Sequence, residues 1–238
     1  MQALILAGGK GARLRPYTTV LPKPLMPVGD YPILEIILRQ LSHAGVTRVI
    51  LAVGYMSQLF QAFFQDGSRY GLDISYSFEE APLGTAGPIA LAFDRLEDDF
   101  LVMNGDLLTT LNYRRLLEFH SGHQAGATIG LHRREVKIDF GVIECDEANR
   151  LTAYREKPIW NFTVSMGINA LNKRTVQPYL TPGEYLDLPD LMLRMRADGH
   201  PVLCYQEPCS WLDVGRLDDY QAATDEFLAR KDEFLPPA

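Results

Sequence analysis

Apolar residues near the N-terminus follow a strand-then-helix rhythm, broken by glycine and proline. The apolar run 4–6 ends at Gly8-Gly9 and predicts a buried strand that leads into a glycine loop. Segment 16–32 carries several prolines and is predicted to be irregular. Residues 33–41 repeat apolar side chains with helical spacing, and an apolar strand pattern follows over 48–53. Together these elements indicate a βαβ unit.

The same alternation continues to about residue 103. It predicts a helix near 59–64, a strand near 74–78, a helix over about 85–96 and a strand over 100–103. Strands that alternate with helices indicate a mostly parallel sheet covered on both faces. We therefore predict an α/β fold, a Rossmann-like three-layer sandwich with a mostly parallel mixed sheet.

The rhythm changes from about residue 126. Short strand patterns occur at 127–131, 141–145 and 151–155, and they predict a hairpin-rich insertion. Further patterns predict a strand at 165–170, a helix at 189–197, a strand at 201–205, a closing helix at 217–230 and a frayed tail at 234–238. We interpret residues 1–238 as a single domain, with a core of about 1–125 and 200–230 and a small lobe of about 126–200.

Composition is that of an ordinary globular protein. The 238 residues are 47% hydrophobic and 22% charged, and the net charge of −7 argues against sequence-independent nucleic-acid binding. No stretch approaches the roughly 20 apolar residues that span a bilayer, and residues 1–7 lack the features of a leader, so we expect a cytoplasmic protein without membrane contact.

The cysteines and histidines suggest no metal site or disulfide framework. Cys145, Cys204 and Cys209 are odd in number and fit no common zinc spacing, so we expect reduced, structural thiols. His120 and His123 lie near a predicted helix end, and we expect both at a solvated helix terminus.

Basic residues concentrate on one glycine-rich loop. Lys10, Arg13, Arg15 and Lys23 all precede Asp30, the first acidic residue. Glycine backbone N–H groups and the guanidinium fork both suit phosphate oxygens, so the loop predicts an anion site. It fits neither the dinucleotide-binding fingerprint nor the Walker pattern, which disfavours an NAD-dependent oxidoreductase.

Two aspartates follow short apolar segments far apart in the chain. Asp106 ends the segment 102–106, and Asp213 follows Trp211-Leu212. Each one alone is typical of a helix or turn cap. In an open α/β sheet, however, the carboxyl ends of the strands line the binding crevice. We therefore expect both carboxylates to bind one Mg²⁺ together with substrate phosphates.

Five motifs occur in order along nearly the whole chain: Gly8-Gly9-Lys10-Gly11-Ala12-Arg13-Leu14-Arg15-Pro16, Lys23-Pro24, Asn104-Gly105-Asp106, Glu156-Lys157-Pro158 and Trp211-Leu212-Asp213-Val214-Gly215. They resemble the motifs of the sugar-1-phosphate nucleotidyltransferases, or NDP-sugar pyrophosphorylases, and are most similar to the mannose-1-phosphate guanylyltransferase-like branch. Ala12 stands where many members carry a small polar residue. Since the motifs run from Leu6 to Gly215, we expect no appended C-terminal domain.

The resemblance implies a role for each matching residue. It implies that Arg13, Lys23 and Asp106 are catalytic and that Asp106 and Asp213 bind Mg²⁺. The implied nucleotide-binding residues are Leu6, Ala7, Gly8, Gly9, Gly11, Arg13, Lys23, Glu79, Gly84 and Asp106. The implied sugar-phosphate-binding residues are Gly141, Glu156, Lys157, Gly167 and Asn169.

The implied reaction joins an NTP to a sugar 1-phosphate and releases pyrophosphate. A phosphate monoester is largely a dianion at pH 7, so no general base is required and none is nominated. The phosphate oxygen attacks the α-phosphorus in line, while the protein positions two anions and neutralises their charge.

The nucleobase is inferred from Glu79, because a carboxylate accepts hydrogen bonds and guanine presents two adjacent donors. GTP is favoured on this reading. Alternatively, Glu79 and Glu80 are solvated and the backbone near Gly84 reads the base, which leaves UTP or dTTP open. Mannose, heptose, glucose and a carbocyclic sugar analogue all remain candidates for the sugar.

A binding role without catalysis is a separate hypothesis. A catalytically silent, sugar-nucleotide-sensing subunit would be expected to lose a metal aspartate or the signature arginine. The chain retains Arg13, Lys23, Asp106, Lys157 and Asp213. The sequence therefore favours the enzyme, and it leaves a homo-oligomer open.

Overall fold

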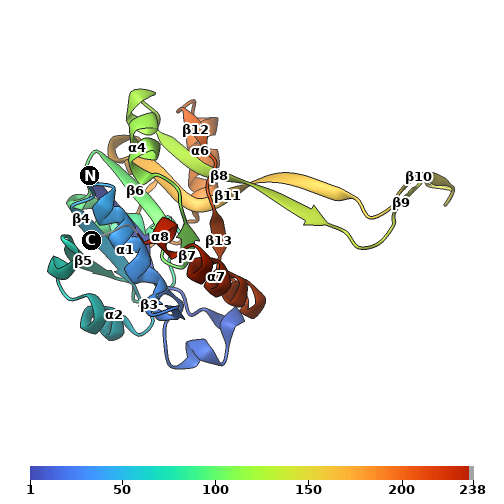
Figure 1. Ribbon diagram of the computed structural model, residues 1–238. Coiled ribbons are helices and arrows are strands. Elements are labelled where there is room, and N and C mark those ends of the chain that lie inside the picture. The colour runs from blue at the N-terminus through green and yellow to red at the C-terminus, as the bar shows by residue number, and fades with distance from the viewer. Residues whose placement is uncertain (236–238) are drawn as a thin grey trace.

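A seven-stranded sheet forms the centre of the computed structural model, which describes residues 1–235. In spatial order its strands are β12 (Val202–Gln206), β8 (Ala127–Lys137), β11 (Ile159–Asn172), β6 (Asp99–Asn104), β1 (Gln2–Leu6), β4 (Arg48–Val53) and β5 (Asp73–Phe78) (Figure 1). Only β11 runs antiparallel to its neighbours. The predicted mostly parallel mixed sheet is confirmed.

Helices cover both faces of this sheet. On one face lie α1 (Ile33–His43), α2 (Ser57–Phe64), α4 (Tyr113–Gly122), α7 (Leu217–Ala229) and α8 (Lys231–Phe234). On the other lie α3 (Gly87–Ala92), α5 (Lys173–Val176) and α6 (Leu188–Ala197). Each face buries its own apolar cluster, as side chains alternate between the two sides of every strand. The three predicted layers are confirmed.

Outside the sheet, two pairings shape the functional end of the molecule. Segment 12–25 contains three short 3₁₀ turns and is followed by the small ladder of β2 (Pro27–Val28) and β3 (Tyr31–Pro32). β7 (Leu107–Thr109) pairs antiparallel with β13 (Trp211–Asp213), so that Asp213 lies opposite Leu107. This second pairing was not predicted, and it joins two motifs that are about a hundred residues apart.

β8 and β11 continue past the edge of the sheet as a two-stranded ribbon. We call residues 133–164 the arm, and its tip is formed by β9 (Val142–Cys145) and β10 (Leu151–Arg155) (Figure 1). The expected hairpin-rich insertion is present. The part that projects is shorter than segment 126–200, because the roots of β8 and β11, together with α6 and β12, belong to the central sandwich.

His120 is buried, so the expectation of a solvated helix terminus was wrong for this residue. Its Nδ1 lies 2.8 Å from the hydroxyl of Thr128, and its Nε2 lies 3.6 Å from a carboxylate oxygen of Asp99. Burial lowers the pKa of the imidazole. The reason is helical periodicity, since His120 lies on the same face of α4 as the buried Leu116 and Leu117.

The three cysteines are free thiols, but Cys145 and Cys204 are exposed, which corrects the expectation of structural, buried residues. Part of the predicted frayed tail is ordered, because Phe234 is fully buried against Phe227. Residues 236–238 lie outside the described part of the chain. Among the described residues, no helix combines the length and the apolar character that crossing a membrane requires.

Helix α6 provides a matched test of the core, because Leu191 is fully buried and Leu193 is 59% exposed. Leu191→Ala should lower the free energy of unfolding by about 2–5 kcal/mol through lost burial and a residual cavity. Leu193→Ala should change it by no more than about 0.5 kcal/mol. Urea denaturation measures both, and equal losses in the two variants would contradict this packing.

Candidate functional site

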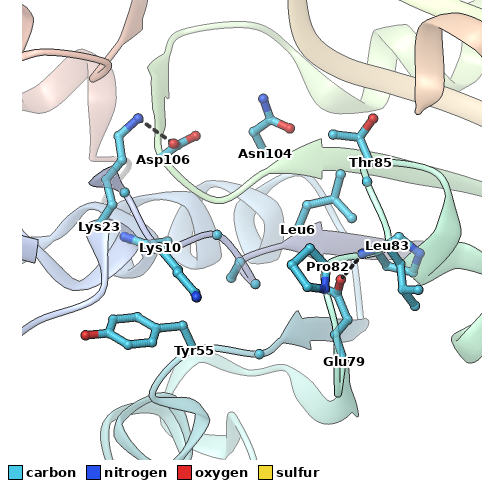
Figure 2. Close-up of a pocket in the computed structure, with 18 of the residues that line it drawn as sticks. Leu6, Lys10, Lys23, Tyr55, Glu79, Pro82, Leu83, Thr85, Asn104 and Asp106 are labelled. Atoms are coloured by element: carbon cyan, nitrogen blue, oxygen red, sulfur yellow. Dashed lines mark hydrogen bonds and ion pairs between the residues drawn. The ribbon is translucent and has the colours of Figure 1, made fainter. Parts of the chain in front are cut away.

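A cavity of about 860 Å³ opens where β1, β4, β5 and β6 end (Figure 2). Parallel strands place their carboxyl ends at one edge of the sheet, so the segments that follow them meet there. All ten residues predicted to bind the nucleotide line this cavity: Leu6, Ala7, Gly8, Gly9, Gly11, Arg13, Lys23, Glu79, Gly84 and Asp106. The geometry brings these residues together, and their binding role remains a prediction.

The glycine loop after β1 exposes its backbone to the cavity. A Cβ at Gly9 would meet no atom within 4 Å, so the peptide groups here are open to a ligand. Gly11 adopts the left-handed φ of +58°, and its carbonyl accepts hydrogen bonds from the Leu14 N–H at 3.0 Å and the Thr18 hydroxyl at 2.8 Å. This turn presents the exposed Arg13 on the same loop.

Lys23, Asp106 and Asp213 form one charged cluster. The Lys23 ammonium lies 2.5 Å from a carboxylate oxygen of Asp106 and 3.7 Å from one of Asp213 (Figure 2 shows the first contact). Lys23 is buried, whereas the side chains of Asp106 and Asp213 are 25% and 43% exposed. The two predicted metal ligands therefore converge, although Asp213 does not line the cavity itself.

The donor set fits a divalent cation that also binds substrate. Two carboxylates already face one positive charge, and their exposed oxygens leave space for water or phosphate ligands, as Mg²⁺ prefers. Among the described residues, no group of three or more His, Cys, Asp or Glu side chains forms a metal site. A metal ion here would thus depend on oxygens from outside the protein.

Glu79 follows β5 and enters the cavity from the side opposite Asp106 (Figure 2). The backbone N–H of Leu83 donates a 3.4 Å hydrogen bond to its carboxylate. Partial burial raises the pKa of Glu79, and the Leu83 contact only partly opposes this effect. Gly84, nearby, has φ of +75°, and a Cβ there would clash with the Leu186 carbonyl.

A distant segment holds the loop that contains Gly84. Asp187 accepts hydrogen bonds from the N–H and hydroxyl of Thr85 at 3.0 and 3.1 Å, and the Tyr185 hydroxyl donates to Asp187 at 2.7 Å. The Tyr185 contact lowers the pKa of Asp187. The Leu186 carbonyl also accepts from the Ala86 N–H at 2.8 Å. The cavity wall is therefore fixed by contacts across about a hundred residues of sequence.

Sequence reasoning missed several cavity residues. Tyr55, Thr85, Asn104 and Tyr185 line the cavity, and Asp187 supports it from behind. Asn104 sits within a recognised motif, and Pro189 near the start of α6 marks Asp187 as a helix start. Neither signal shows that segment 185–188 docks onto the loop after β5.

The predicted sugar-phosphate residues are divided between two places. Gly167, at φ +70°, packs its backbone against the side chain of cavity-lining Asn104. Asn169 is buried in β11, and its side-chain oxygen has no hydrogen-bond partner among the described residues. The other three, Gly141, Glu156 and Lys157, lie on the arm and do not line the cavity.

Comparison with known proteins assigns the family. Residues 2–230 match the model of the nucleotidyl transferase family. The chain belongs to this family. It is 34% identical to the mannose-1-phosphate guanylyltransferase of Mycobacterium tuberculosis, covering 92% of this chain and 62% of the relative. It is 31% identical to the UTP–glucose-1-phosphate uridylyltransferase of Synechocystis, covering 97% and 64%.

This nucleotidyl transferase chain spans less than two thirds of the length of these curated relatives. Among solved structures it resembles a Bacillus anthracis protein provisionally described as a glucose-1-phosphate thymidylyltransferase, with a TM-score of 0.76, 25% identity and 98% coverage of both chains. HddC from Yersinia pseudotuberculosis, at 24% identity and a TM-score of 0.72 over 95% of this chain and 99% of HddC, shares the fold.

Because the pKa of Glu79 is raised, the difference in stability between wild type and a Glu79→Gln variant should depend on pH. Glu79 stabilises the fold most when it is protonated, below the pKa of an unfolded glutamate, and this contribution is lost as pH rises through its raised folded-state pKa. The Glu79→Gln variant should therefore have a higher melting temperature than wild type near pH 7.5, and the two melting temperatures should become equal below about pH 4. Thermal melting of both proteins across pH measures this gap.

The exposed neighbour provides the control, because Glu80→Gln should show no such gap. A lower melting temperature for Glu79→Gln than for wild type at neutral pH would contradict a destabilising, partly buried carboxylate at Glu79. A difference in melting temperature that grows on acidification would contradict it as well.

Proposed function

We propose that this protein transfers a nucleoside monophosphate from an NTP to a sugar 1-phosphate and releases pyrophosphate. The observation that carries the proposal is one cavity lined by the glycine loop, Arg13, Glu79, Lys23 and Asp106, with the Asp213 carboxylate beside Lys23 just outside the lining. Family membership and relatives named as guanylyl- and uridylyltransferases of sugar 1-phosphates support it.

The cavity suits a reaction between two anions. The glycine-loop N–H groups and Arg13 would hold the triphosphate, and Lys23 would share its charge between the phosphates and the carboxylates. Mg²⁺ bound by Asp106 and Asp213 would neutralise charge on the phosphates. No His, Cys or Ser side chain lines the cavity within residues 1–235. That lining agrees with a nucleophile that needs no general base, because a sugar 1-phosphate is largely a dianion.

The enzyme is favoured over a silent, sugar-nucleotide-sensing subunit. Such a subunit needs only to bind, whereas here Arg13, Lys23 and Asp106 all line one cavity with a second carboxylate beside them. This concentration of charge is what neutralisation of a transition state requires.

Asp106→Asn and Asp213→Asn should each lower Mg²⁺-dependent pyrophosphate release by about 100-fold or more, because each removes a preorganised charge at the reacting phosphates. Asp190→Asn, an exposed carboxylate on α6, is the matched control and should keep wild-type turnover. Near-normal turnover in either cluster variant, with the fold intact by circular dichroism, would refute the metal assignment.

For the base, we propose guanine as the preferred partner of Glu79. The carboxylate faces the cavity and already accepts a hydrogen bond from one backbone N–H, so it is suited to a donor-rich base edge. Relatives named mannose-1-phosphate guanylyltransferase support GTP, while the Synechocystis uridylyltransferase keeps UTP, or dTTP, as the alternative.

Among the candidate sugars, mannose 1-phosphate is the first to test, followed by heptose and glucose 1-phosphates and a carbocyclic analogue. The names of the matched relatives put mannose first and keep glucose in the set.

A nucleotide panel tests the base. Wild type should prefer GTP, and Glu79→Gln should lower kcat/KM for GTP by about 10- to 100-fold, as expected for loss of a two-point contact to a base edge. UTP and dTTP should be affected less. Glu80→Gln serves as the control for local charge. A strong wild-type preference for UTP or dTTP would overturn the role of Glu79 and favour the backbone near Gly84.

A further inference from the structure

The arm stands apart from the cavity that its residues are proposed to serve. Beyond the β8–β11 ladder at its root, no side-chain hydrogen bond or ion pair among the described residues joins residues 133–164 to the rest of the chain. β11 runs from Ile159 near the tip to Ser165 beside the sheet, which is about 20 Å at the usual rise of a strand. Lys157 lies beyond Ile159. Figure 1 shows the ribbon projecting from the sheet with β9 and β10 at its far end. Glu156 and Lys157, which lie between β10 and β11, are therefore well away from the cavity of their own chain.

The arm is unusually apolar for an exposed ribbon. Of the 17 exposed large hydrophobic side chains among the described residues, eight lie on it: Val136, Phe140, Ile143, Leu151, Tyr154, Ile159, Trp160 and Phe162. Trp160 pairs across the ladder with Val136, and its ring centroid lies 6.3 Å from that of Phe162, so three apolar side chains lie together on one face. Isolated two-stranded ribbons are marginally stable in water, so such a face is suited to burial against another surface.

The rim of the cavity complements this surface. Tyr17, Val20, Phe78 and Tyr185 are exposed apolar side chains on the segments that surround the cavity. The glycine loop and the turns after it carry cations and no acidic residue before Asp30.

The outer part of the arm, residues 138–158, has a small excess of negative charge, with five acidic and three basic residues, although the whole arm carries six of each sign. Two of its acidic residues are paired internally, as Glu144 with Arg155 and Asp146 with Arg150. Asp139, Glu147 and Glu156 have no ion-pair partner in the described structure, and neither do the nearby cations Lys137 and Lys157. The outer part of the arm therefore offers apolar surface and a small excess of negative charge to a basic, apolar rim.

We propose that two copies of this chain exchange arms, so that the arm of one copy completes the cavity of its partner. This inference rests on the proposed function, because it assigns Glu156 and Lys157 to the sugar phosphate. A two-fold exchange is self-complementary: each copy gives one arm and receives one, and the dimer closes on itself. It buries both apolar arm faces and brings Lys157 to an NTP bound in the other copy.

The competing arrangement is closure within one chain. It would require the ribbon to bend near its root, where the β8–β11 register shifts between Ser165 and Asn169. The two arrangements make opposite predictions for a mixed dimer, which provides a direct test.

Two inactive variants should restore activity when combined. Asp106→Asn disables the cavity and Lys157→Ala disables the arm, and each alone should be inactive. Co-expressed with different affinity tags and purified through both, the mixed dimer unites one intact cavity with one intact arm. It should show about half the wild-type rate of pyrophosphate release, with the substrate pair that wild type uses best. Closure within one chain predicts no activity above the separate variants, and that result would overturn the proposal.

The molecular mass in solution tests whether the apolar face of the arm is buried in a dimer, without relying on activity. Wild type should be a dimer by light scattering, and Trp160→Asp should shift it to the monomer, because a charge is placed in the buried apolar face. Leu193→Asp, on the exposed side of α6, should remain dimeric. A monomeric wild type would overturn arm exchange. A dimeric wild type that Trp160→Asp dissociates but that turns over no substrate pair would refute the proposed function instead.

Discussion

The buried ammonium of Lys23 is the contact on which the functional end of the molecule depends. A charged group buried in protein is costly unless it is paired, and here Asp106 and Asp213 provide the pairing. The three residues come from the N-terminal loop, the end of β6 and the C-terminal β13. Asp213 is in position only because β13 pairs with β7. The cluster therefore links parts of the chain that no continuous segment connects.

The opposite wall of the cavity is organised without buried charge pairs. Asp187 accepts from both the N–H and the hydroxyl of Thr85, and main-chain bonds from Leu186 extend this contact along the loop. Gly84 fits only because it lacks a side chain beside the Leu186 carbonyl. Both walls are thus preorganised by contacts between distant segments, which reduces the ordering that a ligand must impose.

The sequence predicted the cavity better than it predicted the molecule around it. The strand ends could be located from apolar runs, and parallel strands bring those ends together. The ten residues proposed to bind the nucleotide were named from the resemblance to known motifs, and the structure places all ten around the cavity at those strand ends. The β7–β13 pairing, the docking of Asp187 and the burial of His120 depend on contacts between distant segments that no local pattern encodes. The position of the arm could not be predicted from the sequence either. Strand patterns show that a hairpin exists, but not how far it extends or in which direction.

The residues proposed to contact the base and those proposed to contact the sugar phosphate lie on separate parts of the chain. The loop after β5, where Glu79 and Gly84 lie, is built into the sandwich, whereas Glu156 and Lys157 lie on a ribbon that joins the sandwich only through the β8–β11 ladder at its root. Under the proposed function, the residues that select the base and those that select the sugar can therefore change independently during evolution, each in its own part of the chain.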